Sequence, residues 1–193
     1  MLERLSNKFA CRLIHAGIIS KSDADIYMYG FFQLIMMTLN IMTTLLLGML
    51  FHLLISCILL NLSYIPIRIN AGGHHADSPI KCYIDSTIMN AVLLIVVKWF
   101  PIHIFVSITL FFLSGILICI LAPVETKNNP WSKAEKIGYR KRTRIILGIE
   151  IIVSAIALIF KKNWIFEVIM LGIFTEGLML LIGKCNIIIS KEK

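Results

Sequence analysis

The chain has 193 residues, of which 58% are apolar and only 16% are charged, and its mean hydropathy is +0.85. A soluble domain carries about 25% charged and about 45–50% apolar residues, so this apolar excess is too large for one core and must face lipid. The composition therefore excludes soluble enzymes, secreted disulfide scaffolds and disordered chains. The charge is lopsided, with 19 Lys and Arg against 11 Asp and Glu, which in a membrane protein points to topology before it points to an acidic partner. No nucleic acid is expected as a partner.

Residues 1–25 form an amphipathic segment ahead of the first apolar run. Its apolar residues recur at helical spacing on one face, and polar residues occupy the opposite face. The apolar residues are Leu2, Leu5, Phe9 and Leu13, and the opposing polar residues are Arg4, Asn7 and Lys8. The pattern predicts a helix in the inner-leaflet interface, held by apolar burial and by contact with lipid headgroups. A solvated helix packed on the protein's own loops fits the pattern equally well.

Six membrane crossings are predicted from the uncharged stretches, and the fold class is an all-α polytopic membrane protein forming one integral-membrane domain over residues 1–193. A spanning helix needs about 20 mostly apolar residues. Residues 26–67 contain 42 residues without Asp, Glu, Lys or Arg, which is room for two spans with a turn near residues 50–52. The other four spans are predicted at residues 79–97, 101–124, 145–160 and 164–183.

The distribution of basic residues predicts the orientation. With both termini in the cytoplasm, 16 of the 19 Lys and Arg residues fall on the cytoplasmic side, and only Lys98, Lys161 and Lys162 fall outside. Positive residues accumulate in cytoplasmic loops. We therefore predict a multi-pass membrane protein, with cytoplasmic termini and with cytoplasmic loops at residues 68–82 and 123–144.

Polar residues capable of chemistry concentrate in the loop at residues 68–82. Gly72 and Gly73 allow a sharp turn or a close approach to a substrate. Ser78 is predicted to be a helix N-cap and Pro79 the first helical residue. The third span then runs for roughly 19 residues, or about 28 Å, which is long enough to cross the bilayer.

Cys82 falls in the first turn of that predicted helix, where the helix dipole and the free amides favour a thiolate. The break before the helix allows His75 to fold back over this turn. A Cys–His pair within hydrogen-bond reach is the usual activated thiol nucleophile, so we predict Cys82 and His75 as catalytic residues. The residue that orients the imidazole stays open among three candidates, Asp77, Asp85 and Asn70.

Two other interpretations of this loop remain. A histidine and a cysteine in a loop beside the membrane often have no catalytic role. His74 and His75 with Cys82 also provide ligand types that suit zinc or copper. The loop lacks a CxxC motif and a second histidine at ligand spacing, so we expect neither a metal nor another cofactor.

Three glutamates fall within the last two predicted spans. Acidic residues inside a membrane are functional candidates. Glu176 lies in the middle of its span and is expected to face the interior of the bundle, whereas Glu150 and Glu167 lie near span ends and are expected to reach the interface. The alternative function is therefore a small membrane transporter or an ion-binding membrane protein, although the inverted repeats typical of transporters are not visible. A sensor or scaffold without catalysis is a third hypothesis.

The loop at residues 68–82 resembles the active-site loop of the accessory gene regulator B (AgrB) family. The matching residues are Arg68, Gly72-Gly73-His74-His75-Ala76 and Cys82. A second stretch, Ala122-Pro123-Val124-Glu125-Thr126-Lys127-Asn128-Asn129-Pro130, resembles the second cytoplasmic loop of that family. The resemblance covers nearly the whole chain, including its length, its six spans, its amphipathic N-terminus and both loops.

This resemblance implies a membrane cysteine endopeptidase of quorum sensing in Gram-positive bacteria, expected to form a homodimer. The implied substrate is a propeptide with an amphipathic helix, a signal core that contains a cysteine, and an acidic tail. Cys82 would cut off the tail with His75 as base, and the cysteine of the substrate would convert the thioester into a thiolactone ring. The basic residues of the loop at residues 123–144 could attract the tail, or they could simply reflect the positive-inside rule.

Overall fold

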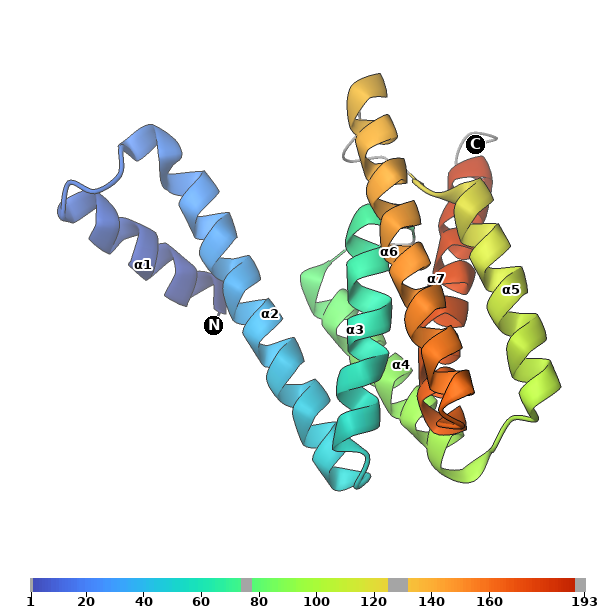
Figure 1. Ribbon diagram of the computed structural model, residues 1–193. Helices are drawn as coiled ribbons and strands as arrows, with labels where there is room; N and C mark the ends of the chain where they lie inside the picture. The colour runs from blue at the N-terminus through green and yellow to red at the C-terminus, as the bar shows by residue number, and fades with distance from the viewer. Residues whose placement is uncertain (1, 74–77, 125–131, 190–193) are drawn as a thin grey trace. The chain divides into compact units, whose positions relative to one another are not determined.

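A computed structural model describes residues 2–73, 78–124 and 132–189 (Figure 1). Its elements are α1 (Leu2–His15), the 3-10 helix η1 (Lys21–Asp23), α2 (Ala24–Leu50), α3 (Leu54–Ala71), α4 (Pro79–Trp99), α5 (Ile104–Leu121), α6 (Lys133–Ile159) and α7 (Asn163–Ile189). The predicted all-α class is confirmed, and the long apolar helices make the chain a polytopic membrane protein.

The first two predicted spans are α2 and α3, with a turn at residues 51–53. The turn is closed by the Leu53 N–H, which donates to the Gly48 carbonyl at 2.8 Å, and His52 adopts a left-handed conformation with φ of 56°. A Cβ on Gly48 would stand 2.9 Å from the Cβ of Cys57. Glycine at this position therefore lets the end of α2 approach α3.

In the part of the chain that the structure describes, five helices are long and apolar enough to cross a membrane, namely α2, α3, α4, α5 and α7. The remaining long helix, α6, is the predicted fifth span. Its last 18 residues still contain Arg142, Arg144 and Glu150, so it is less apolar than the other five. The crossing by its apolar half, residues 145–159, stays a prediction.

The start of α6 is defined by a reciprocal capping box. The Ser132 hydroxyl accepts the Glu135 N–H at 3.3 Å, and the Glu135 carboxylate accepts the Ser132 N–H at 2.8 Å. These bonds satisfy two N–H groups that have no partner within the helix. They also lower the pKa of Glu135, chiefly through the backbone N–H of Ser132.

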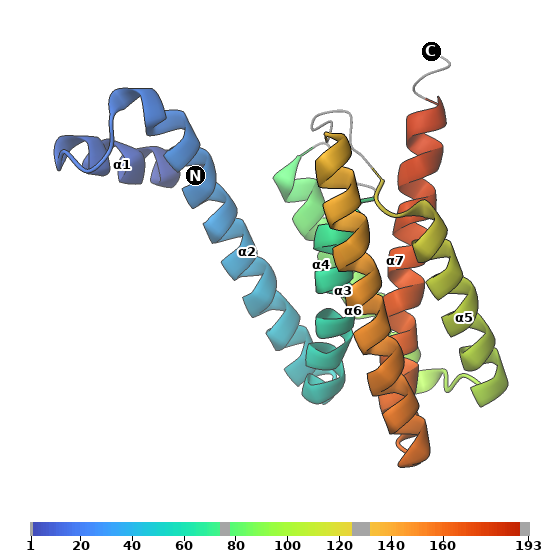
Figure 2. The same ribbon diagram turned by 45° about the horizontal axis from the view of Figure 1, so that its top comes forward.

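The chain divides into two compact units, one formed by residues 1–46 and 76–89 and the other by residues 47–75 and 90–193. In the second unit α7 is the central helix and packs against α3, α5 and α6 (Figure 2). Phe111 of α5 and Phe166 of α7 meet in its core, with ring centroids 5.4 Å apart. Leu60 and Ile67 of α3 are also buried in this core.

Polarity in the second unit is distributed as expected for a protein surrounded by lipid. Large apolar side chains point outward, as in Phe105 and Ile120 of α5, which are 73% and 70% exposed. Small hydroxyl residues such as Ser63, Ser107 and Ser154 are buried between the helices. Small residues let helix backbones approach closely, which drives association where the hydrophobic effect between helices is absent.

Gly172 marks a close contact between α7 and α3. A Cβ on this residue would stand 2.9 Å from the Cβ of Ser63 and 3.3 Å from the carbonyl oxygen of Leu60. Glycine on α7 and serine on α3 thus allow the two helices to pack backbone against backbone.

The first unit contains α1, residues 24–46 of α2 and the start of α4. Phe9 of α1 stacks on Phe31 of α2, with ring centroids 5.0 Å apart. The hydroxyls of Thr43 and Tyr83 share a hydrogen bond of 2.7 Å between α2 and α4.

The buried side chains of α1 are Ser6 and Ala10, among those that the structure describes, rather than the large apolar ones. Leu5 and Phe9 remain 45% and 43% exposed. The predicted helix is confirmed, and its apolar face is left largely uncovered by protein. The position of this face in the membrane interface stays a prediction.

Gly172→Ala should destabilise the second unit, because the added methyl group overlaps Ser63 and overpacking of this kind costs about 1–3 kcal/mol. We expect the melting temperature in detergent, followed by size-exclusion chromatography of heated samples, to fall by several degrees. Gly115→Ala on α5 is the matched control, since nothing lies within 4 Å of its added Cβ. Equal melting temperatures for the two variants would contradict the proposed close packing.

Candidate active site

The predicted helix start at Pro79 is confirmed. The Ser78 hydroxyl accepts the N–H of Lys81 at 3.3 Å, and the Ser78 carbonyl accepts the N–H of Cys82 at 3.0 Å. Ser78 therefore acts as the N-cap that the sequence predicts, and proline at the first helical position loses no hydrogen bond.

Cys82 lies in the first turn of α4 with an exposed side chain and a free thiol. The site residue predicted with it, His75, lies outside the described residues, as do His74, Ala76 and Asp77. The pairing of Cys82 with His75 therefore stays a prediction, and so does the soft-metal alternative. Within the described residues, no group of three His, Cys, Asp or Glu side chains could hold a metal ion.

Two of the candidates for orienting the imidazole can be described. The Asn70 side-chain amide donates to the Pro66 carbonyl one turn earlier on α3 at 2.8 Å. Asp85 is exposed on α4. Neither arrangement selects the orienting residue.

Two hydrogen bonds join Arg68 and Gly72 at the end of α3. The Gly72 N–H donates to the Arg68 carbonyl at 3.1 Å, and the Nη1 of Arg68 donates to the Gly72 carbonyl at 2.8 Å. Gly72 has a φ of 75°, a region that L-residues with a Cβ rarely adopt. The predicted sharp turn at these glycines is confirmed.

Gly73 brings the chain against α7. Its φ is 113°, and a Cβ at this position would collide with the Arg68 guanidinium and stand 3.1 Å from the carbonyl oxygen of Met179. Glycine at this position therefore lets the chain approach the backbone of α7 closely, whereas the predicted approach to a substrate stays a prediction.

The segments that follow α3 and α5 meet in space. The Val124 N–H donates to the Ala71 carbonyl at 2.8 Å, and Gly72 and Val124 form a parallel bridge. These segments belong to the two motifs that resemble the AgrB family loops. The predicted topology puts both segments on the same side of the membrane, but the sequence contains no signal for this direct bond.

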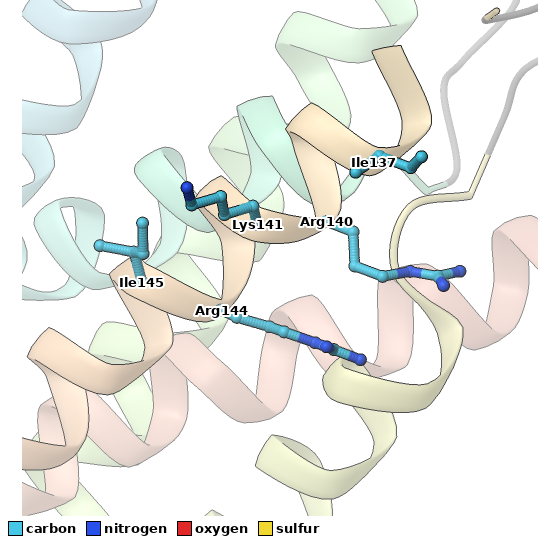
Figure 3. A pocket seen from close by; sticks show the side chains of 5 residues that line it. All are labelled: Ile137, Arg140, Lys141, Arg144 and Ile145. Carbon is cyan, nitrogen blue, oxygen red and sulfur yellow. The ribbon is translucent and has the colours of Figure 1, made fainter. Parts of the chain in front are cut away.

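The basic half of α6 lies beside the second of these segments. The Nε of Arg140 donates to the Ala122 carbonyl at 3.3 Å, and Figure 3 shows the Arg140 side chain extending from α6 toward the chain that leaves α5. This face of α6 carries an open pocket of about 430 Å³. Its lining residues are Ile137, Arg140, Lys141, Arg144 and Ile145.

Glu176 is completely buried on α7, as predicted for a residue that faces the bundle interior. Neither of its carboxylate oxygens has a hydrogen-bond partner within the described residues. Arg68 is a cation on α3, the helix that packs against α7.

Glu150 makes a contact with α3. Its carboxylate accepts a hydrogen bond from the Ser63 hydroxyl at 3.1 Å, between α6 and α3. This contact depends on the rotation of α6 about its axis, which is not visible in the sequence, and the expected position of Glu150 at the interface stays a prediction. Glu167 is half-buried near the start of α7, and its contact with the interface stays a prediction.

Comparison with known proteins identifies the family. The model of the family Accessory gene regulator B matches residues 3–180. Accessory gene regulator protein B of Staphylococcus carnosus is 31% identical over 135 residues, which cover 68% of this chain and 66% of that protein. Accessory gene regulator protein B of Staphylococcus aureus is 34% identical over 121 residues, which cover 63% and 62% of the two chains.

Putative AgrB-like protein 2 of Clostridium perfringens is 25% identical over 176 residues, which cover 85% of this chain and 81% of that protein. No solved structure matches the chain. Since the family match extends over nearly the whole length and includes both motif segments, the chain belongs to the accessory gene regulator B family.

Proposed function

We propose that this protein is a membrane-embedded cysteine endopeptidase that processes a quorum-sensing propeptide, with Cys82 as nucleophile and His75 as general base. The observation that carries the proposal is the order Arg68, Gly72-Gly73, His75, Cys82 in a chain that belongs to the AgrB family. The exposed position of Cys82 in the first turn of a capped helix supports it.

The chemistry follows the usual course of thiol acyl transfer. The Cys82 thiolate attacks the carbonyl carbon that joins the signal core to the acidic tail, and His75 holds the thiol proton. His75 then protonates the leaving amine, the C–N bond breaks and the tail departs. The signal core remains bound to Cys82 as a thioester.

Ring closure is a second acyl transfer. The cysteine of the substrate attacks the thioester carbonyl, a new thioester forms within the peptide, and the Cys82 sulfur leaves. One thioester replaces another, so the step needs positioning and exclusion of water more than it needs driving force. Burial of the site in the membrane would supply both requirements.

The acidic tail of the substrate would bind the basic half of α6. Lys141 and Arg144 line the pocket on this helix. Arg140 donates a hydrogen bond to the Ala122 carbonyl and so holds the segment after α5 beside the pocket. The positive-inside rule also accounts for this cluster. A variant with fewer charges here separates the two explanations.

The proposed orientation places both motif segments and both termini in the cytoplasm. Thiols stay reduced there, and a newly made propeptide is accessible. The exposed apolar faces of the helices would contact membrane lipids, and a homodimer is the assembly that the family resemblance implies.

The transporter alternative rests on one observation, the buried carboxylate of Glu176. It predicts no covalent step at Cys82. Substitution of this cysteine therefore distinguishes the two functions.

Cys82→Ser should lower propeptide cleavage by at least about 1000-fold, because loss of a nucleophile removes most of the catalytic rate. The measurement is mass spectrometry of the tail released in liposomes from a synthetic propeptide with an amphipathic helix, a core that contains a cysteine, and an acidic tail. Cys185→Ser, a change at another exposed free thiol, is the matched control. Cleavage at the wild-type rate by Cys82→Ser would refute the peptidase.

His75→Ala should lower the same rate by about 100-fold or more, the usual contribution of a general base. His74→Ala is the neighbouring control and should retain most activity. If His74→Ala loses activity and His75→Ala retains it, His74 is the general base instead.

Gly73→Ala should lower turnover by about 10- to 100-fold, because the added methyl group displaces the segment that leads to His75. Gly138→Ala, with nothing within 4 Å of the added Cβ, should keep wild-type turnover. Similar turnover for both variants would show that the approach to α7 does not matter for activity.

Neutralising Lys141 and Arg144 together to Gln should lower kcat/KM about two- to tenfold, since each exposed ion pair contributes about 0.2–1 kcal/mol. The loss should shrink at high salt or with a substrate whose tail is uncharged. Lys161 and Lys162, changed together to Gln in the turn between α6 and α7, provide the control. An equal loss with the uncharged tail would assign the cluster to topology alone.

A further inference from the structure

Arg68 controls the direction in which the chain leaves α3. Its guanidinium donates to the Gly72 carbonyl, while its own carbonyl accepts the Gly72 N–H. Ala71, in the same turn, accepts the N–H of Val124. The orientation of the Arg68 side chain is therefore linked to the contact between the two motif segments.

The Arg68 guanidinium also lies against α7. The position that a Cβ of Gly73 would occupy is adjacent both to the Arg68 guanidinium and to the carbonyl oxygen of Met179. Met179 follows Glu176 by three residues, or about one helical turn. The guanidinium is thus close to the part of α7 that carries Glu176.

The carboxylate of Glu176 lies in an energetically unfavourable environment. Its side chain is completely buried, and its two oxygens lack hydrogen-bond partners within the described residues. Burial of a carboxylate is unfavourable unless an opposite charge compensates it. Arg68 can supply this charge, because its guanidinium lies beside the Met179 carbonyl, about one turn after Glu176. Its planar guanidinium has five N–H donors, enough for both a carbonyl and a carboxylate.

We propose that Glu176 is a positioning residue of the peptidase, which acts as the counter-ion of Arg68 and thereby fixes Gly72 and the segment that leads to His75. This proposal rests on the proposed function for its effect on catalysis. Its structural part concerns only α3, α7 and the Ala71–Val124 contact. The two parts can therefore be tested separately.

The structural test is hydrogen–deuterium exchange of the Val124 amide in the full-length protein in lipid nanodiscs. Glu176→Gln removes the charge at nearly constant volume and should accelerate this exchange at least about fivefold, because the segment is no longer held through Arg68. Glu167→Gln makes the same change on the same helix and should leave the exchange unchanged. Wild-type exchange in Glu176→Gln would overturn the proposal.

A double substitution tests whether Glu176 acts through Arg68. Arg68→Gln alone should accelerate Val124 exchange, and adding Glu176→Gln should then change it no further, because the pathway is already broken. The same acceleration in the presence and absence of Arg68 would overturn the proposal, since it would indicate a general loosening of α7.

The catalytic test compares kcat with KM for propeptide cleavage. Glu176→Gln should lower kcat about tenfold or more with little change in KM, and Glu176→Asp, which keeps the charge, should recover part of kcat. If Glu176→Gln folds poorly, Glu176→Asp provides the test instead. In this variant, a lower kcat and faster exchange of the Val124 amide must appear together. An unchanged kcat would overturn the positioning role, whereas full cleavage by Cys82→Ser would overturn only the peptidase and leave the exchange result standing.

Discussion

Water does not reach the backbone of a helix inside the hydrocarbon layer, so each N–H and C=O there must be bonded within the helix. This constraint explains why most of the chain is helical, since the long apolar segments have no other way to form hydrogen bonds with their backbone N–H and C=O groups. Irregular backbone is confined to the helix ends, where the described chain contains its glycines with positive φ and its single bridge between Gly72 and Val124. The candidate chemistry is confined to helix ends for the same reason.

Packing between these helices relies on small residues rather than on apolar burial. Gly172 of α7 lies against Ser63 of α3, and a Cβ added to Gly177 of α7 would stand 3.5 Å from the Cβ of Ser114 on α5. Both glycines therefore let α7 approach its neighbours closely. This closeness also brings the carbonyl oxygen of Met179 to Gly73. The segment that leads from α3 toward His75 is thus supported by the most central helix of its unit.

The parts of the site that depend on local physics could be predicted. Ser78 and Pro79 define the start of α4 through a cap and a fixed φ, and both act within four residues of chain. The burial of Glu176 also follows from its place in the middle of an apolar segment. The position of Glu150 could not be predicted, because it depends on which face α6 presents to α3.

The sequence by itself determined that the chain is a helical membrane protein, that α4 begins at Pro79, and which segment contains the cysteine and the histidine. Hydropathy, caps and turns are properties of neighbouring residues, so no partner is needed to recognise them. Only the tertiary structure decided that Ala71 meets Val124, that Gly73 lies against α7 and that Ser63 meets Glu150. These contacts join residues far apart in the chain, and they depend on how each helix is rotated and which helix it packs against.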